Sequence, residues 1–159
     1  MSEQNNAGVL NGAELKGMEN YRSLMDVFHE AVQRFADKPA FSCMGQTLTF
    51  TELDRLSADF AAWLQHETEL QPGDRIAIQL PNVLQFPIAV FGALRAGLVV
   101  VNTNPLYTER EMAHQFKDSG ARAILILANM ASKLEKVLDR TRIVFPLLKP
   151  TTLTLIILN

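Results

Sequence analysis

Residues 75–101 read RIAIQLPNVLQFPIAVFGALRAGLVVV, and this stretch decides the fold. It opens with mostly apolar residues that Pro81 brings to an end, which predicts a strand over residues 75–80. It closes with the β-branched run at residues 98–101, which is typical of a strand covered on both faces of a sheet. The two strands are far enough apart for a crossover connection, so we expect them to run parallel.

The segment between these strands, residues 83–96, is apolar almost all round. This pattern is typical of a helix that is buried on several sides, and we expect it to be the most buried helix of the chain. Pro87 lies inside the segment, which requires a kink or a helix start near that residue. Gly97 provides the C-terminal stop.

The same alternation continues toward the C-terminus. Thr108 and Glu111 form a capping-box pattern that predicts a helix start, and Gly120 is expected to end that helix. An apolar strand over residues 123–127 and a short amphipathic helix over residues 131–139 follow. The order β-α-β-α-β-α predicts an α/β fold with an open, mostly parallel sheet and helices on both faces.

Upstream of residue 75 the pattern predicts two helices and a hairpin. Apolar residues at helical spacing follow Ser23, the expected N-cap, and Pro39 is expected to end this first helix. Two short β-forming segments, residues 40–44 and 46–50, flank a glycine and predict an N-terminal β-hairpin. Thr51 is the expected N-cap of the second helix.

Composition limits the classes of function. The chain has 159 residues, 48% of them hydrophobic, as expected of a folded domain and not of a disordered chain. Its net charge of -2 gives no support for nucleic-acid binding. A single cysteine, Cys43, excludes an intrachain disulfide and a cysteine-based zinc site.

Nothing in the sequence indicates export or membrane insertion. The N-terminus has neither a basic start nor an apolar core, so it does not read as a secretory signal. The most apolar stretch near the end of the chain, residues 143–158, is interrupted by prolines and a lysine and is too short to span a membrane. We therefore expect a cytoplasmic protein without a transmembrane segment.

Few side chains suggest chemistry. The eight glycines form neither phosphate-binding pattern, G-x-G-x-x-G or G-x-x-x-x-G-K-[ST]. Cys43 has no basic neighbour that would activate it and is expected to be a packed thiol. Asp74 is expected to bond its own backbone in a turn. The histidines lie in helical segments without a second histidine nearby and are expected on exposed faces; they are His29, His66 and His114.

Asn102, Thr103 and Asn104 are the most suggestive polar group. They follow a predicted parallel strand, and open α/β sheets bind ligands at the carboxyl ends of their strands. Asparagine is also a common turn residue, so a turn is the main interpretation and a ligand contact is the alternative. We predict no catalytic, cofactor-binding or metal-ligating residue in this chain.

Several motifs, in the right order, resemble the adenylate-forming enzymes. Residues 49–53 (TFTEL) resemble the first core motif of that family, and residues 94–102 (LRAGLVVVN) resemble the second. Residues 73–82 (GDRIAIQLPN) resemble a further stretch typical of the family. Residues 102–108 (NTNPLYT) and 114–121 (HQFKDSGA) narrow the resemblance to the N-terminal part of bacterial long-chain fatty-acid–CoA ligases, which are AMP-forming acyl-CoA synthetases.

The resemblance implies a fold and a reaction. Such ligases use ATP and Mg to convert a fatty acid to an acyl-adenylate, and then transfer the acyl group to coenzyme A. The matching motifs are mainly scaffold of the large N-terminal domain, and the ATP-binding and catalytic motifs lie beyond residue 159. The resemblance therefore implies that ATP, Mg, coenzyme A and a fatty acid bind only when the rest of the enzyme is present. It also implies that this chain alone is inactive, and that the full-length family can lie peripherally on membranes.

The resemblance divides the chain into three parts. Residues 1–19 are expected to be a flexible lead-in, residues 20–142 a partial N-terminal ligase domain, and residues 143–159 a divergent apolar tail. Residues 153–158 (LTLIIL) form a sticky β-segment, and the helix at residues 83–96 is expected to leave apolar surface uncovered, so we expect self-association. Two alternatives stay open: a stand-alone scaffold or interaction module, and a small binding protein that keeps part of an acyl crevice.

Overall fold

A computed structural model describes residues 21–149 of the chain. In chain order its elements are α1 (Leu24–Phe35), β1 (Pro39–Cys43), β2 (Gln46–Thr49), α2 (Phe50–Glu67), β3 (Arg75–Gln79), α3 (Gln85–Arg95), β4 (Val99–Asn102), α4 (Glu109–Ser119), β5 (Ala123–Leu127), a 3₁₀ turn (Ala128–Met130), α5 (Ala131–Leu138) and β6 (Phe145–Lys149). The expected lead-in at residues 1–19 and the segment at residues 153–158 lie outside the described residues.

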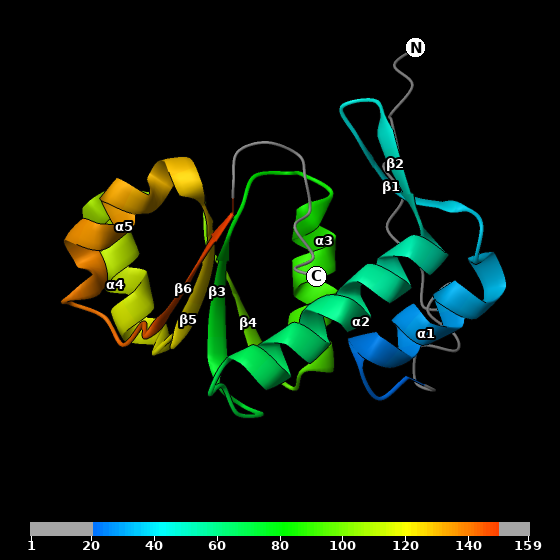
Figure 1. Cartoon of the computed structure of the whole chain (residues 1–159), viewed down its shortest axis with the longest axis horizontal. Coiled ribbons are helices and arrows are strands. Elements are labelled where there is room, and N and C mark those ends of the chain that lie inside the picture. The colour runs from blue at the N-terminus through cyan, green and yellow to red at the C-terminus, as the bar shows by residue number, and fades with distance from the viewer. Residues whose placement is uncertain (1–20, 150–159) are drawn as a thin grey trace, which may run out of the picture.

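Four parallel strands form the sheet, in the order β4-β3-β5-β6. Helices α2 and α3 lie on one face of this sheet, and α4 and α5 lie on the other (Figure 1). The hairpin of β1 and β2 is a separate antiparallel pair. These observations confirm the predicted fold: an open parallel sheet with helices on both faces and an N-terminal β-hairpin.

Successive side chains of a strand point to opposite faces of the sheet, so the core is divided between the two faces. Ile76 and Ala123 pack with α2 and α3. Ala77, Ile124 and Ile126 point the other way and pack with α4 and α5. All five side chains are buried, so both faces of the two inner strands, β3 and β5, are covered.

Helix α3 is the most buried helix among the described residues, as predicted. None of its residues is exposed. Pro87 lies in its first turn, where a missing N–H costs nothing. A Cβ at Gly92 would lie 2.7 Å from Cδ1 of Phe60 and 2.9 Å from the carbonyl oxygen of Ser57, so α2 and α3 approach too closely there for a side chain.

The N-terminal unit of α1 and the hairpin packs on α2 and α3, away from the sheet (Figure 1). Phe28 of α1 stacks on Phe91 of α3, with ring centroids 4.1 Å apart. Arg95 of α3 pairs with Asp54 of α2, and its guanidinium carbon lies 5.5 Å from the centre of the Phe28 ring. The three helices therefore meet around one half-buried cation.

Local capping explains where α1, α2 and α4 begin, and one prediction about it was wrong. The hydroxyl of Ser23 caps α1 and that of Thr108 caps α4, both as predicted. The N-cap of α2 is Thr49, with Glu52 as its partner, and not Thr51. Thr49 ends β2 and begins α2 without a loop, and its hydroxyl is therefore the one that reaches the third backbone N–H of the helix.

Three further expectations are corrected by the packing. Helix α1 ends at Phe35, well before Pro39, which instead begins β1. Strand β4 is not covered on both faces: it is an edge strand, and Val99 is 47% exposed. Helix α3 contributes no exposed side chain, so it is not the source of uncovered apolar surface that was expected. Strand β6 lies within residues 143–159 and continues the sheet beside β5.

Candidate functional site

The strand order places a switch point between β3 and β5. The connection after β3 passes over one face of the sheet through α3, whereas the connections after β4 and β5 pass over the opposite face through α4 and α5. In open parallel sheets of this order, ligands bind outside the carboxyl ends of the strands at such a point. The carboxyl end of the sheet is therefore the candidate functional site.

Gln79, the last residue of β3, is the central side chain of this end. It is fully buried, and its Nε2 donates a hydrogen bond to the carbonyl oxygen of Asn104 at 3.1 Å. Its Oε1 is buried and has no hydrogen-bond donor among the described residues. An unpartnered buried acceptor costs free energy, so this position calls for a donor from another source.

The loop after β4 contains the three polar residues that the sequence singled out. The backbone N–H of Thr103 donates to the carbonyl oxygen of Ile78 at 3.0 Å, which extends the sheet pattern by one residue. The side-chain oxygen of Asn104 accepts a bond from the N–H of Leu106 at 2.9 Å. Thr103 is buried, whereas Asn102 is exposed. The turn interpretation is confirmed for Asn104, whose side chain closes an Asx turn.

Two more side chains fix this loop from the helices. Gln115 of α4 donates from Nε2 to the carbonyl oxygen of Asn102 at 3.1 Å, and its own buried Oε1 has no donor among the described residues. Lys133 of α5 donates to the carbonyl oxygen of Tyr107 at 2.6 Å. Glutamines at the end of a strand and within a helix carry no motif, so sequence reasoning missed both of them.

The start of α4 adds a charged group beside the loop. Glu111 accepts bonds from the hydroxyl and the backbone N–H of Thr108, at 2.7 and 2.8 Å. The bond from the Thr108 hydroxyl is the main cause that lowers the pKa of Glu111. An open depression of about 290 Å³ lies next to it on the outer side of α4 and is lined by Tyr107, Glu111, His114, Gln115 and Asp118.

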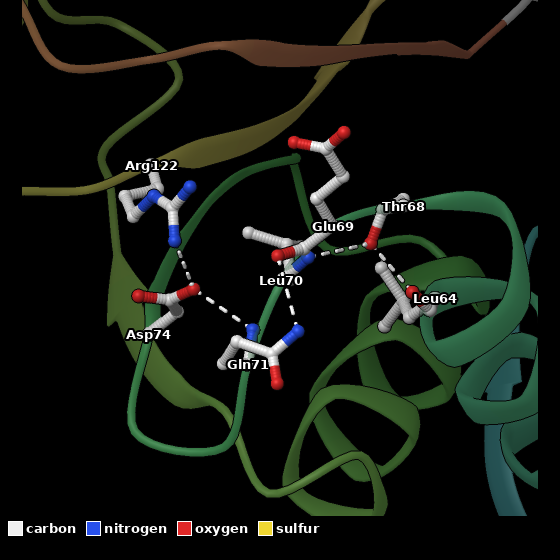
Figure 2. A network of polar contacts seen from close by, with 7 residues as sticks. All are labelled: Leu64, Thr68, Glu69, Leu70, Gln71, Asp74 and Arg122. Carbon is white, nitrogen blue, oxygen red and sulfur yellow. Dashed lines mark hydrogen bonds and ion pairs between the residues drawn. The ribbon is translucent and has the colours of Figure 1, made fainter.

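The opposite, amino end of the sheet holds a closed polar network (Figure 2). One carboxylate oxygen of Asp74 accepts the backbone N–H of Gln71 at 2.8 Å and the guanidinium of Arg122 at 2.6 Å. The hydroxyl of Thr68 accepts the N–H of Leu70 at 3.3 Å. Asp74 is the turn residue that the sequence predicted, and it also ties β3 to β5 through Arg122.

The remaining candidates are exposed or have structural contacts, and His114 is the one that lines the depression beside α4. All three histidines are exposed, as predicted. Cys43 is partly buried, and its thiol donates to the carbonyl oxygen of Asn82 at 3.2 Å, in agreement with a packed thiol. Among residues 21–149, no group of three or more His, Cys, Asp or Glu side chains is placed to hold a metal ion.

The described residues at the carboxyl end of the sheet lack two features that a triphosphate site uses. A triphosphate needs closely approaching backbone N–H groups and a cation. The connection between β3 and α3 contains neither a glycine nor a basic residue, and α3 begins without a side-chain cap. Lys133, the cation at this end, is already bonded to Tyr107. The prediction that the chain contains no catalytic, cofactor-binding or metal-ligating residue stays a prediction.

The described part of the chain also lacks a membrane-crossing element, since none of its helices combines the necessary length and apolar character. The expected cytoplasmic location stays a prediction.

Comparisons with known proteins agree on one family. The family model described as AMP-binding enzyme matches residues 28–157. The chain is 54% identical over 125 residues to a long-chain-fatty-acid–CoA ligase of Escherichia coli O6:H1, which is 79% of this chain and 22% of that protein. It is 40% identical over 116 residues to the corresponding ligase of Bacillus subtilis, or 73% of this chain and 20% of that one. The chain thus spans about a fifth of the length of the curated relatives it matches.

A solved structure shows the same fold. The crystal structure of a long-chain-fatty-acid-CoA ligase from Archaeoglobus fulgidus superposes with a TM-score of 0.72 over 80% of this chain and 27% of that one, at 20% identity. The arrangement of a parallel sheet with helices on both faces is therefore that of the N-terminal domain of adenylate-forming enzymes.

Proposed function

Since the chain belongs to the family of AMP-binding enzymes, we propose that it forms the N-terminal part of a long-chain fatty-acid–CoA ligase. The observation that carries this proposal is the 54% identity to such ligases over 79% of the chain. The family model matches residues 28–157, a range that includes the strands of the sheet and the loop after β4. The chain thus contributes the sheet that supports the site, and the rest of the enzyme supplies the groups that react.

The proposed reaction has two steps in the whole enzyme. The fatty-acid carboxylate attacks the α-phosphorus of ATP, so that pyrophosphate leaves and an acyl-adenylate forms. The thiol of coenzyme A then attacks the acyl carbon, and AMP leaves. ATP, Mg and coenzyme A serve the full-length enzyme in this proposal, and no residue among 21–149 is assigned to either bond-making step.

We predict that the 159-residue chain alone does not adenylate fatty acids. The physical reason is that, among residues 21–149, the carboxyl end of the sheet lacks the phosphate-binding backbone and the free cation that stabilise the transferred charge. The measurement is fatty-acid-dependent pyrophosphate release by the purified chain, with a full-length ligase as the positive control. Release above the no-fatty-acid blank would overturn the prediction and would show that the chain is an enzyme by itself.

We also infer that the isolated chain self-associates through apolar β-structure. Two features support this: the edge strand β4 carries no charged residue and exposes Val99, and residues 153–158 combine high β-propensity with no charge. Uncovered strands of this kind pair with other chains. Light scattering of the intact chain and of a form without residues 151–159 tests the inference. The deletion should reduce the mean mass, and a monomer unchanged by it contradicts the inference.

A further inference from the structure

Helix α1 has an apolar face that is wider than the part its neighbours cover. Phe28 is buried, and Met25 and Val32 pack beside it against α2 and α3. Leu24, Val27 and Phe35 lie on the adjoining part of the helix surface and are 55%, 37% and 41% exposed. This second group of three side chains is called the outer α1 face below.

The outer α1 face is continuous along the helix. Positions 24, 27, 31 and 35 follow the three- and four-residue spacing that places side chains one above the other. Position 31 is a half-buried alanine, so the face has no polar interruption. The apolar stripe of an amphipathic helix is usually covered by another segment of the protein.

The chain that leads into α1 returns alongside this face. The hydroxyl of Tyr21 donates to Glu30, nine residues later, and Arg34 donates to the same carboxylate at 2.9 Å. The guanidinium carbon of Arg34 also lies 5.2 Å from the ring centre of Phe35. These contacts border the outer α1 face, so Tyr21, the first described residue, lies beside it. They also raise the pKa of Tyr21 and lower that of Glu30, each mainly through their shared hydrogen bond.

The preceding twenty residues have the composition and the length to cover the face. They contain five apolar residues close to α1 in sequence: Val9, Leu10, Ala13, Leu15 and Met18. Helix α1 is about 18 Å long, because it has 12 residues and each adds about 1.5 Å. Residues 9–20 span up to roughly 40 Å when extended, and their attachment to α1 keeps their local concentration high.

We propose that residues 9–18 of this chain bind the outer α1 face, with Leu10, Leu15 and Met18 packed against Leu24, Val27 and Phe35. The segment acts as an internal cover that closes the exposed side of the N-terminal unit. It replaces the flexible lead-in that the composition suggested. Other occupants of the face, a second copy of the chain or the remaining part of the ligase, are outcomes that the experiment separates.

The test uses backbone hydrogen exchange of the full-length chain. A variant with Leu10→Ser, Leu15→Ser and Met18→Ser removes the apolar contacts. Its matched control, Asn5→Ser with Asn6→Ser and Asn11→Ser, changes three polar residues in or just before the segment. Amides of α1 should exchange several-fold faster in the first variant and at the unchanged rate in the control. Amides of β3 and β5 should not change in either, which shows that the fold is intact.

A second variant approaches the contact from the helix. Val27→Ser should raise the exchange of α1 and of residues 9–18 together, because each protects the other. Equal α1 protection in all variants overturns the proposal. Protection of α1 that falls on dilution of the intact chain also overturns it and identifies a second copy as the cover. Protection that appears only in a full-length ligase overturns it in favour of the rest of the enzyme.

Discussion

The two ends of the parallel sheet differ in whether their polar side chains find hydrogen-bond partners. At the amino end, one oxygen of Asp74 accepts hydrogen bonds from the Gln71 N–H and the Arg122 guanidinium. The contacts of this network all lie within residues 21–149 (Figure 2). At the carboxyl end, Gln79 and Gln115 each donate to a loop carbonyl but leave a buried oxygen without a donor among the described residues. One end is complete within residues 21–149, and the other is not.

The difference separates the scaffold from the functional end. At the amino end no buried side-chain nitrogen or oxygen among residues 21–149 lacks a partner, and the network stabilises one arrangement of the turn and the strands. Buried acceptors without donors are rare in native structures and call for a water or for groups from elsewhere. Their position at the switch point of the sheet, where ligands of such folds bind, favours the carboxyl end as the functional end of this fold.

Among the substitutions that test this difference between the two ends of the sheet, Gln79→Glu should have the largest effect on stability. The substitution places an unpaired negative charge where the side chain is fully buried, and we expect a loss of about 3 kcal/mol in the free energy of unfolding at neutral pH. Urea denaturation followed by the fluorescence of Trp63 measures it. The loss should shrink in acid, because the buried carboxyl becomes neutral there.

Gln79→Leu is the matched control for that charge. It removes the hydrogen bond to Asn104 and the unpartnered oxygen at the same time, so the free energy of unfolding should change by no more than about 1 kcal/mol. A loss as large as that of Gln79→Glu would mean that Oε1 has a strong partner, and the two ends of the sheet would then be alike.

At the amino end, Asp74→Ala should lower the free energy of unfolding by about 2 kcal/mol. The reason is that two donors, the Gln71 N–H and the Arg122 guanidinium, lose one shared acceptor. Thermal and urea unfolding of this variant and of Arg122→Met measure the effect. If both variants are as stable as the parent chain, the closed network does not hold the amino end together.

The smallest effect concerns the helix that begins at the carboxyl end. Thr108→Ala removes the N-cap of α4, and we expect a loss of about 1 kcal/mol in the free energy of unfolding. Thr49→Ala, which removes the same kind of cap from α2, is the matched variant. Equal stability of the parent and both variants would contradict the role of the capping boxes.

The same boxes predict how stability depends on pH. The pKa values of Glu52 and Glu111 are lowered from 4.5 in the folded chain, by the Thr49 backbone N–H and the Thr108 hydroxyl respectively. The unfolded chain therefore takes up protons first, so the boxes stabilise the fold above about pH 4.5 and lose that contribution as the pH falls further. Between pH 6 and pH 3 the free energy of unfolding should fall less steeply for Thr108→Ala than for the parent chain.

Most of the scaffold could be predicted from sequence because its signals are local. The alternation of apolar strands and helices, the boxes at Ser23 and Thr108, and the stop at Gly120 each depend on a few neighbouring residues. Gly45 belongs to the same class: it and Met44 both have positive φ, 78° and 50°, as a two-residue hairpin turn requires.

The misses depend on contacts that no local pattern contains. A run of valines at residues 99–101 is equally typical of an inner strand and of an edge strand, and only the strand order makes β4 an edge. Gln79 and Gln115 are ordinary residues until the fold buries their oxygens. Thr49 and Thr51 both suit an N-cap, and the direct junction of β2 with α2 decides between them.

The strand order has a consequence for how the chain is assembled during synthesis. Of the four strands of the parallel sheet, β3 is made first, and it is an inner strand. Strands β4, β5 and β6 are then each added at an edge that already exists. No strand must be inserted between two earlier ones, so a ribosome could release the chain at any length beyond β5 with a gap-free sheet.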